Sequence, residues 1–297
     1  MDTDRYYYIA DYRVAGLFSC VNRVLNICQE FEKYNLIPLV WWGDSNCYWE
    51  NGGYRGSVNV WEYYFEPLSG ISLDSEPNRN KIRSINPKIN PIVKDGVAPR
   101  GKDVGNLYFP NRVRGHETIQ KYLRIRKEIL AIAQDFCRLH FKSYTIGLHL
   151  RGPGRYHGGS SWIRKHFTLR RNVPFDLYFE YVYQELEQHS DAVIFLATDA
   201  DIVKQECIRE FGDRVVTINH DLSPEGNDHL KNQGGPRAAK AGEECLIDAI
   251  ALSYTNYFVH ATSNVSNFVC CYNRDLRDIN VYEAGLKKKG IDLRKIM

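Results

Sequence analysis

The sequence predicts an α/β protein with two domains, in which a β-α-β unit with parallel strands opens the first half and the second half is a doubly wound sheet. Short apolar segments of strand length alternate with longer segments of helical periodicity along most of the chain. Glycines and polar residues follow the strand-like segments, as is typical of doubly wound sheets. A length of 297 residues corresponds to two domains at roughly 150 residues each.

The first half opens with a β-α-β pattern. Residues 6–10 form an apolar, tyrosine-rich strand, and Gly16 provides a tight turn. Apolar residues then recur at helical spacing over 17–31, before a second strand at 38–42. A strand, helix and strand in this order predict two parallel neighbouring strands.

The middle of the chain is less regular. Residues 43–115 are rich in glycine, proline, asparagine and serine and show no clear periodicity. Residues 118–140 then show one continuous helical pattern. We place the domain boundary at the end of this helix, which gives domains of residues 1–139 and 140–297.

The second half alternates more cleanly. Strands are expected at 144–150, 192–198, 214–218 and 257–261, and helices at 175–189, 201–211, 243–254 and from 265 onward. The strand at 192–198 is almost wholly apolar, which is expected when both faces of a sheet are covered. This half therefore reads as a doubly wound, Rossmann-like domain.

Composition excludes several classes of protein. The chain is 43% hydrophobic and 25% charged, its net charge is only +3, and its mean hydropathy is −0.44. This balance excludes a disordered chain and provides no basic excess for nucleic acid. No apolar run approaches the ~18 residues of a membrane helix, and the first residues do not resemble a signal peptide. We therefore expect a cytoplasmic protein.

The eight cysteines show no C-x-x-C pair and no cysteine–histidine spacing typical of zinc. We expect reduced, mostly buried thiols and no metal site.

Polar side chains stand where the predicted strands of the second half end. Arg151 follows the first of these strands and precedes glycines, a setting that suits bidentate capture of a phosphate. Residues 151–171 hold further cations and no acid, so they could form an anion-binding lid, or simply a solvated basic loop. Asp199 and Asp201 follow the next strand, where a carboxylate can contact a base or ribose. Alternatively, Asp199 caps the next helix.

Ser263, Asn264 and Ser266 begin the last helix. Backbone N–H groups at a helix start can bind a phosphate, although the same residues also suit an ordinary helix cap.

Four stretches together resemble the fucosyltransferase superfamily of GT-B glycosyltransferases, which includes protein O-fucosyltransferases, α-1,6-fucosyltransferases and nodulation-factor fucosyltransferases. The stretches are IGLHLRG at 146–152, IFLATD at 194–199, LIDAIALS at 246–253 and SNVSNF at 263–268. Their order and spacing match the family over most of residues 140–275. GLFS at 16–19 resembles the glycine turn of the N-terminal domain, and Gly16 is expected to let the backbone approach the donor.

The resemblance implies two Rossmann-like domains that face each other across a cleft. It implies inverting, metal-independent transfer from GDP-fucose to a glycan or protein hydroxyl, with no cofactor. Residues 140–297 would bind the nucleotide sugar and residues 1–139 the acceptor. By resemblance, Arg151 would bind the β-phosphate. His149, together with Asp199 or Asp201, would contact the guanine base. Ser263, Asn264 and Ser266 would hold the diphosphate, and Asp248 would brace the loops.

The sequence also departs from the family pattern. A second arginine and an acid often follow the first arginine in the family, but Gly152, Pro153 and Gly154 stand here. The acid after Asp199 is replaced by Ala200. The general base is therefore open: His157, Asp44 or a donor phosphate oxygen could accept the proton. Two other functions also remain open, a transferase for another GDP- or UDP-sugar and an inactive saccharide-binding module.

Overall fold

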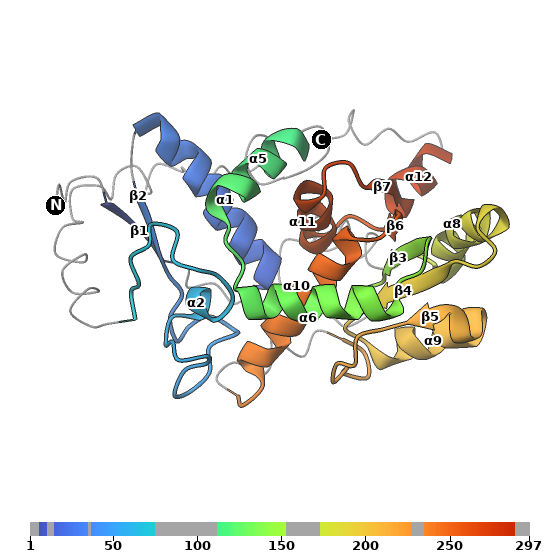
Figure 1. The fold of residues 1–297 in the computed structure, drawn as a ribbon, viewed down its shortest axis with the longest axis horizontal. Helices are drawn as coiled ribbons and strands as arrows, with labels where there is room; N and C mark the ends of the chain where they lie inside the picture. The colour runs from blue at the N-terminus through green and yellow to red at the C-terminus, as the bar shows by residue number, and fades with distance from the viewer. Residues whose placement is uncertain are drawn as a thin grey trace, which may run out of the picture. The chain divides into compact units, whose positions relative to one another are not determined.

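A computed structural model describes residues 6–10, 15–34, 37–74, 112–152, 173–226 and 235–288 (Figure 1). The chain divides into two compact units. The first comprises Met1–Ala131 and His229–Ile247, and the second comprises Ile132–Asp228 and Asp248–Met297. Helices α6 (Lys127–His140) and α10 (Ala238–Ser253) each begin in the first unit and end in the second. The boundary that we place after residue 139 lies at the end of α6 and stays a proposal.

The first unit contains the predicted β-α-β arrangement. Strands β1 (Tyr6–Ala10) and β2 (Ile37–Trp41) pair in parallel, with Tyr6 opposite Ile37 and Ala10 opposite Trp41. Helix α1 (Leu17–Tyr34) connects them and buries an apolar face of Leu17, Phe18, Val21, Val24, Leu25 and Cys28. The helical periodicity of this segment is thus explained by one buried face.

An aromatic core stands where the sequence shows no regular pattern. Helix α2 (Val60–Tyr64) is capped by Asn59, whose side chain also accepts a hydrogen bond from the backbone N–H of Trp42 at 3.0 Å. The rings of Trp42 and Trp61 meet edge to face with their centroids 5.1 Å apart. Asn59 and this ring pair hold α2 against the end of β2.

The predicted single helix over 118–140 is wrong, because two helices occupy this region. Helix α5 (Arg112–Tyr122) and α6 are separated by residues 123–126. The backbone of this break pairs with residues 64–66: Glu66 N–H donates to Arg124 O, and Arg126 N–H donates to Tyr64 O. Apolar periodicity runs across the break since Leu123 and Ile125 are both buried.

The second unit contains a five-stranded parallel sheet in the order β5-β4-β3-β6-β7 (Figure 1). Its strands are β3 (Thr145–His149), β4 (Val193–Ala197), β5 (Val215–Val216), β6 (Tyr257–His260) and β7 (Arg277–Asn280). The chain starts at the centre, builds toward β5, and then returns to build toward β7. This is the predicted doubly wound topology, with its switch point between β3 and β6.

Both faces of this sheet are covered by helices. Ile146, Leu148, Ile194 and Leu196 share one core cluster with residues of α8 (Phe175–Gln188), α9 (Asp201–Phe211) and α12 (Val281–Lys288). Phe195, on the opposite face, contacts Phe136 of α6 and Phe141, with ring centroids 5.5 and 5.4 Å apart. Covered faces explain why the strand sequences are almost wholly apolar.

Four details of the second half differ from the sequence prediction. Strand β5 has only two residues and follows a short 3-10 helix, η2 (Gly212–Arg214). Helix α10 begins at Ala238, before the expected residue 243. Helix α11 (Asn264–Tyr272) ends before a polar edge strand, β7, which the sequence pattern did not indicate. Helix α12 follows this strand.

Among the helices in the described ranges, none is both long and apolar enough to cross a membrane.

Candidate functional site

The switch point of the second unit's sheet brings two strand ends together. His149 at the end of β3 lies opposite His260 at the end of β6 in the strand register. The carboxyl ends of strands flanking a switch point form the usual ligand crevice of an open α/β sheet. The residues that follow β3, β4 and β6 are therefore the first candidates for a binding site.

Asp199 links the segments after β3 and β4. Its Oδ1 accepts a hydrogen bond from the backbone N–H of Gly152 at 2.8 Å, and its Oδ2 lies 3.9 Å from Nε of Arg151. The alternative prediction that Asp199 caps α9 is wrong, because the N-cap is Ala200. The carboxylate instead binds the backbone of Gly152 and lies near Arg151, the residue that the sequence indicates for phosphate binding.

Two glycines allow this close approach. A Cβ on Gly152 would lie 2.5 Å from Cβ of Ala200 and closer still to the carbonyl oxygen of Glu225. Gly226 has φ +85°, and a Cβ there would lie 2.8 Å from Oδ1 of Asp199. Gly226 was not predicted as a site residue, because its only signal in the sequence is its place in a glycine-rich loop.

Asp201 stands apart from this arrangement. It is the first residue of α9, its side chain is exposed, and its Oδ1 lies 3.5 Å from Nε2 of Gln205 one turn further on. Of the two acids predicted to meet a base or ribose, the structure brings only Asp199 beside Arg151.

His149 lies in an environment that keeps its imidazole neutral. Burial lowers the pKa of His149 to about 4, with the charges of His260 and Arg151 acting in the same direction and Asp199 opposing them. A neutral imidazole offers one N–H donor and one acceptor nitrogen. His149 can therefore form two kinds of hydrogen bond with a polar ligand at neutral pH.

The start of α11 is a capping box. Oγ of Ser263 accepts from the N–H of Ser266 at 3.0 Å, and Oγ of Ser266 accepts from the N–H of Ser263 at 2.9 Å. Ser266 is fully buried, whereas Asn264 is exposed on the first turn. The two hydroxyl groups serve the cap, so a phosphate at this helix start would meet backbone N–H groups.

Asp248 connects α10 to the loop after β5. Its Oδ1 lies 3.0 Å from Nε2 of His220, and both side chains are nearly buried. This contact is of the kind that the resemblance implies for Asp248, a brace from a helix to a loop.

The remaining predicted site residues, Gly16, Asp44 and His157, come from other segments of the chain than Arg151, Gly152 and Asp199. Gly16 precedes α1, and its carbonyl accepts from the N–H of Ser19 at 2.9 Å. Asp44 is exposed in the turn after β2 in the first unit. His157 and the other cations of 153–171 lie outside the described residues.

Within the described ranges, one group of three side chains has the chemistry of a metal site: His260, Cys270 and Asp278.

Comparisons with known proteins identify the fold. No family model matches the sequence, and no curated protein matches it. The structure is similar to fucosyltransferase NodZ from Bradyrhizobium at 16% identity, covering 93% of this chain and 94% of that one, with a TM-score of 0.52. It matches POFUT1 in its apo form at 12% identity, covering 94% and 98%, with a TM-score of 0.54.

A third match is NodZ α-1,6-fucosyltransferase soaked with GDP-fucose, at 16% identity, 93% and 94% coverage and a TM-score of 0.51. The chain therefore has the GT-B fold of these fucosyltransferases, and the predicted fold class is confirmed. The resemblance to fucosyltransferases that the sequence stretches show is thus confirmed for the fold.

Proposed function

We propose that this protein is an inverting glycosyltransferase that moves fucose from GDP-fucose to a hydroxyl group of a glycan or protein. The observation that carries the proposal is the arrangement of Arg151, Asp199 and Gly152 at the switch point of the second unit's sheet. Its support is the fold shared with fucosyltransferases, one of which was soaked with GDP-fucose. The donor site would belong to residues 140–297 and the acceptor site to residues 1–139.

Arg151 is the proposed ligand of the β-phosphate. A guanidinium carries five N–H donors in a rigid fork, so contact between Nε and Asp199 is compatible with a bidentate contact to phosphate. Arg151 is only partly exposed, with a side-chain exposure of 32%. Restricted exposure strengthens a charged contact compared with one in bulk water.

The start of α11 would stabilise the same diphosphate. Its first N–H groups and the helix dipole place positive potential beside the strand end. Arg151 and this helix start would together stabilise the charge that builds up as GDP departs. This supports a transfer step without Mg²⁺ or Mn²⁺ at the diphosphate.

His149 is the proposed contact for guanine. The carboxylate oxygens of Asp199 already face Gly152 and Arg151, so we assign Asp199 to positioning and His149 to the base. Because its low pKa keeps His149 neutral, the imidazole can form hydrogen bonds with a neutral base without burying an unpaired charge.

In the proposed reaction an acceptor oxygen forms a bond to the anomeric carbon of fucose while the bond from that carbon to the β-phosphate oxygen breaks. The acceptor proton must pass to a base. Asp44, His157 and a donor phosphate oxygen are the three candidates, as in the sequence analysis.

The test is a panel of sugar nucleotides in which release of the nucleoside diphosphate is followed over time. Selective hydrolysis of GDP-fucose supports the proposal, and GDP-mannose controls for the sugar while UDP-glucose controls for the base. Preference for a UDP-sugar would contradict the donor assignment. Glycan binding without turnover of any donor would show a saccharide-binding module instead.

A further inference from the structure

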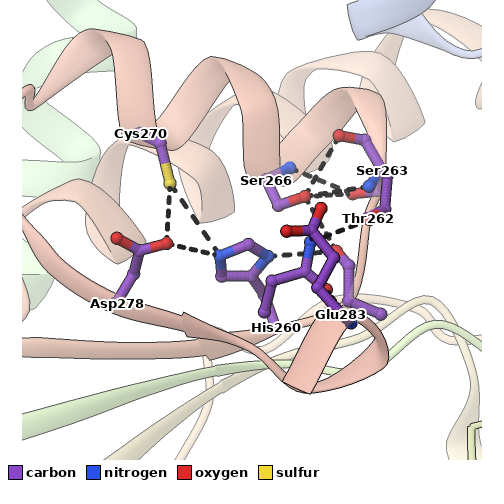
Figure 2. Close-up of polar contacts among 9 residues, drawn as sticks. His260, Thr262, Ser263, Ser266, Cys270, Asp278 and Glu283 are labelled. Atoms are coloured by element: carbon purple, nitrogen blue, oxygen red, sulfur yellow. Dashed lines mark hydrogen bonds and ion pairs between the residues drawn. The ribbon is translucent and has the colours of Figure 1, made fainter. Parts of the chain in front are cut away.

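Three metal-ligating side chains meet beside the carboxyl end of β6 (Figure 2). His260 ends β6, Cys270 lies on α11, and Asp278 lies on β7. Nε2 of His260 is 2.9 Å from Oδ2 of Asp278 and 3.9 Å from Sγ of Cys270, and this sulfur is 3.7 Å from the same Oδ2. The side chains of His260 and Asp278 are only 6% and 10% exposed.

The arrangement differs from that of a nucleophilic cysteine with its base. In such a system the cysteine and the orienting carboxylate contact opposite nitrogens of the imidazole. Here both contact Nε2, while Nδ1 lies 3.1 Å from the carbonyl oxygen of Ala261 (Figure 2). Three donor atoms therefore converge on one point, and no chain of proton transfer runs through the ring.

The contact at Nδ1 is of the kind that orients a metal-binding histidine. A histidine that binds a metal through one nitrogen usually donates its other N–H to a carbonyl or carboxylate. Nδ1–H of His260 can donate to Ala261 O, which leaves the lone pair of Nε2 directed at Cys270 and Asp278. The same carbonyl accepts a hydrogen bond from Oγ of Ser266 at 2.9 Å, so its position is fixed from two sides.

We propose that His260, Cys270 and Asp278 bind a thiophilic divalent cation of the Zn²⁺ class. A cation at ordinary distances of about 2.0–2.3 Å from the three atoms fits their observed separations with angles of about 90°, 115° and 125° at the metal. These angles sum to about 330°, close to the sum of about 328° for three ligand–metal–ligand angles at a tetrahedral metal. The fourth position is left for a water molecule.

Charge and chemistry agree with this assignment. Binding requires the thiolate of Cys270, so the thiol proton leaves to solvent. The thiolate and the Asp278 carboxylate then balance the two positive charges of the cation. Nitrogen, sulfur and one oxygen are the ligands that Zn²⁺ takes in proteins, whereas Mg²⁺ prefers oxygen alone.

The site would fasten three elements to one another. Strand β6, helix α11 and strand β7 each contribute one ligand, and Ala261 O joins His260 to the capping serine of α11. The cation would thus connect α11 to the two neighbouring strands β6 and β7. Sequence patterns do not indicate this site, because its ligands are spread over 260–278 without the short spacing of zinc motifs.

The metal-free alternative is a buried ion pair. In that state burial opposes a charged imidazole, but the hydrogen bonds to Asp278 and Cys270 raise the pKa of His260 to about 10. A protonated His260 would then donate to both Ala261 O and Asp278, and no cation would be needed.

A titration with Co²⁺ distinguishes the metal site from the metal-free ion pair. The metal-free protein is titrated with Co²⁺ under anaerobic conditions, and Zn²⁺ is then added to displace the cobalt. We expect about one Co²⁺ per chain, a thiolate-to-cobalt absorption band, and loss of that band when Zn²⁺ is added. Cys270→Ala should abolish the band and weaken binding by at least about tenfold. Cys271→Ala is the matched control, since Cys271 is a buried neighbour on the same helix outside the group, and it should retain both.

Circular dichroism will show whether each variant folds, and Asp278→Asn provides a second test if Cys270→Ala does not. Asp278→Asn should keep the thiolate band but weaken binding. The titration of the unmodified protein is decisive by itself. Failure of the unmodified protein to bind either cation, or equal binding by Cys270→Ala, overturns the proposal and leaves the ion pair.

Discussion

The carboxylate of Asp199 accepts a hydrogen bond from the backbone N–H of Gly152 at 2.8 Å and thereby joins the end of β4 to the turn after β3. The same carboxylate lies 3.9 Å from Nε of Arg151. One acidic side chain thus binds the backbone after β3 and lies near the guanidinium of Arg151 at the switch point. This relationship places a carboxylate beside the residue on which the proposed donor site depends.

Gly152→Ala should disrupt that relationship. The added methyl group would meet Ala200 and the carbonyl of Glu225, so the turn must move and the hydrogen bond to Asp199 must break. We expect the free energy of unfolding to fall by about 1–3 kcal/mol, together with a loss of GDP affinity of about tenfold or more. Urea unfolding and calorimetry measure the two effects.

Gly285→Ala is the matched control for this variant. A Cβ at Gly285 in α12 would lie 3.5 Å from Leu177, an ordinary contact. We expect unchanged or slightly higher stability, since alanine is the better helix former. Equal behaviour of the two variants would show that the close approach at Gly152 is unimportant.

Glu243 should make the stability of the first unit depend on pH. It is fully buried, and it accepts hydrogen bonds from Arg55 at 2.7 Å, Lys240 at 2.8 Å and Tyr54 at 2.9 Å. Burial alone would raise the pKa of Glu243, but these three donors lower it below its usual value. A lowered carboxyl pKa stabilises the fold above the unfolded pKa, and this contribution is lost as pH falls through the folded pKa.

Glu243→Gln should therefore lower the free energy of unfolding by about 3 kcal/mol at pH 7. The difference from the unmodified protein should shrink as pH falls below about 4. Glu244→Gln, which weakens one contact with a half-exposed Arg237, should change stability by about 1 kcal/mol or less. Denaturant unfolding at pH 7, 5 and 3.5 tests this, and a pH-independent difference for Glu243→Gln would refute the linkage.

Transfer from the donor should not require Mg²⁺ or Mn²⁺. Arg151 and the helix start of α11 are the proposed partners of the diphosphate, and they need no bridging cation. We expect equal turnover with and without either cation in chelator-treated buffer. Zinc is held constant in both arms, so that occupancy of the His260–Cys270–Asp278 group does not vary. Activity that appears only when Mg²⁺ or Mn²⁺ is added would assign the enzyme to a different mechanism.

The general base can be identified by comparing Asp44→Asn with His157→Ala. Loss of the base should lower turnover by about a hundredfold or more while GDP binding is retained. We expect at most one of the two variants to show this pattern. Near-normal turnover in both would exclude each side chain and leave a donor phosphate oxygen as the acceptor of the proton.

The fold of the second unit is largely predictable from sequence because its strands are apolar on both faces and its helices are separated by polar loops. Strand β7 was missed because its residues, Arg277–Asn280, are mostly polar and lie at the sheet edge. The break between α5 and α6 was missed for the opposite reason. Its buried Leu123 and Ile125 continue the helical pattern, while the pairing with residues 64–66 that ends the helix is a long-range contact.

The position of Arg151 at the end of β3 was predictable, because the strand and the turn after it are set by local sequence. Contacts between residues that are far apart in the sequence were not predictable. Asp199 could equally have been a cap, and only the position of Gly152 shows which contact it makes. The roles of Gly226 and of the group around His260 depend on packing between segments, which local sequence patterns do not record.

Calorimetric titration with GDP is the most direct test of the central claim, that the switch point of this sheet binds the donor nucleotide. We predict binding of GDP to the unmodified protein, with weaker binding of UDP and ADP. Arg151→Ala should bind GDP about tenfold to a hundredfold more weakly, because a charge-assisted bidentate contact contributes about 1.5–3 kcal/mol, and it should unfold at an unchanged temperature. Failure of GDP to bind, or equal affinity in Arg151→Ala, would contradict the account.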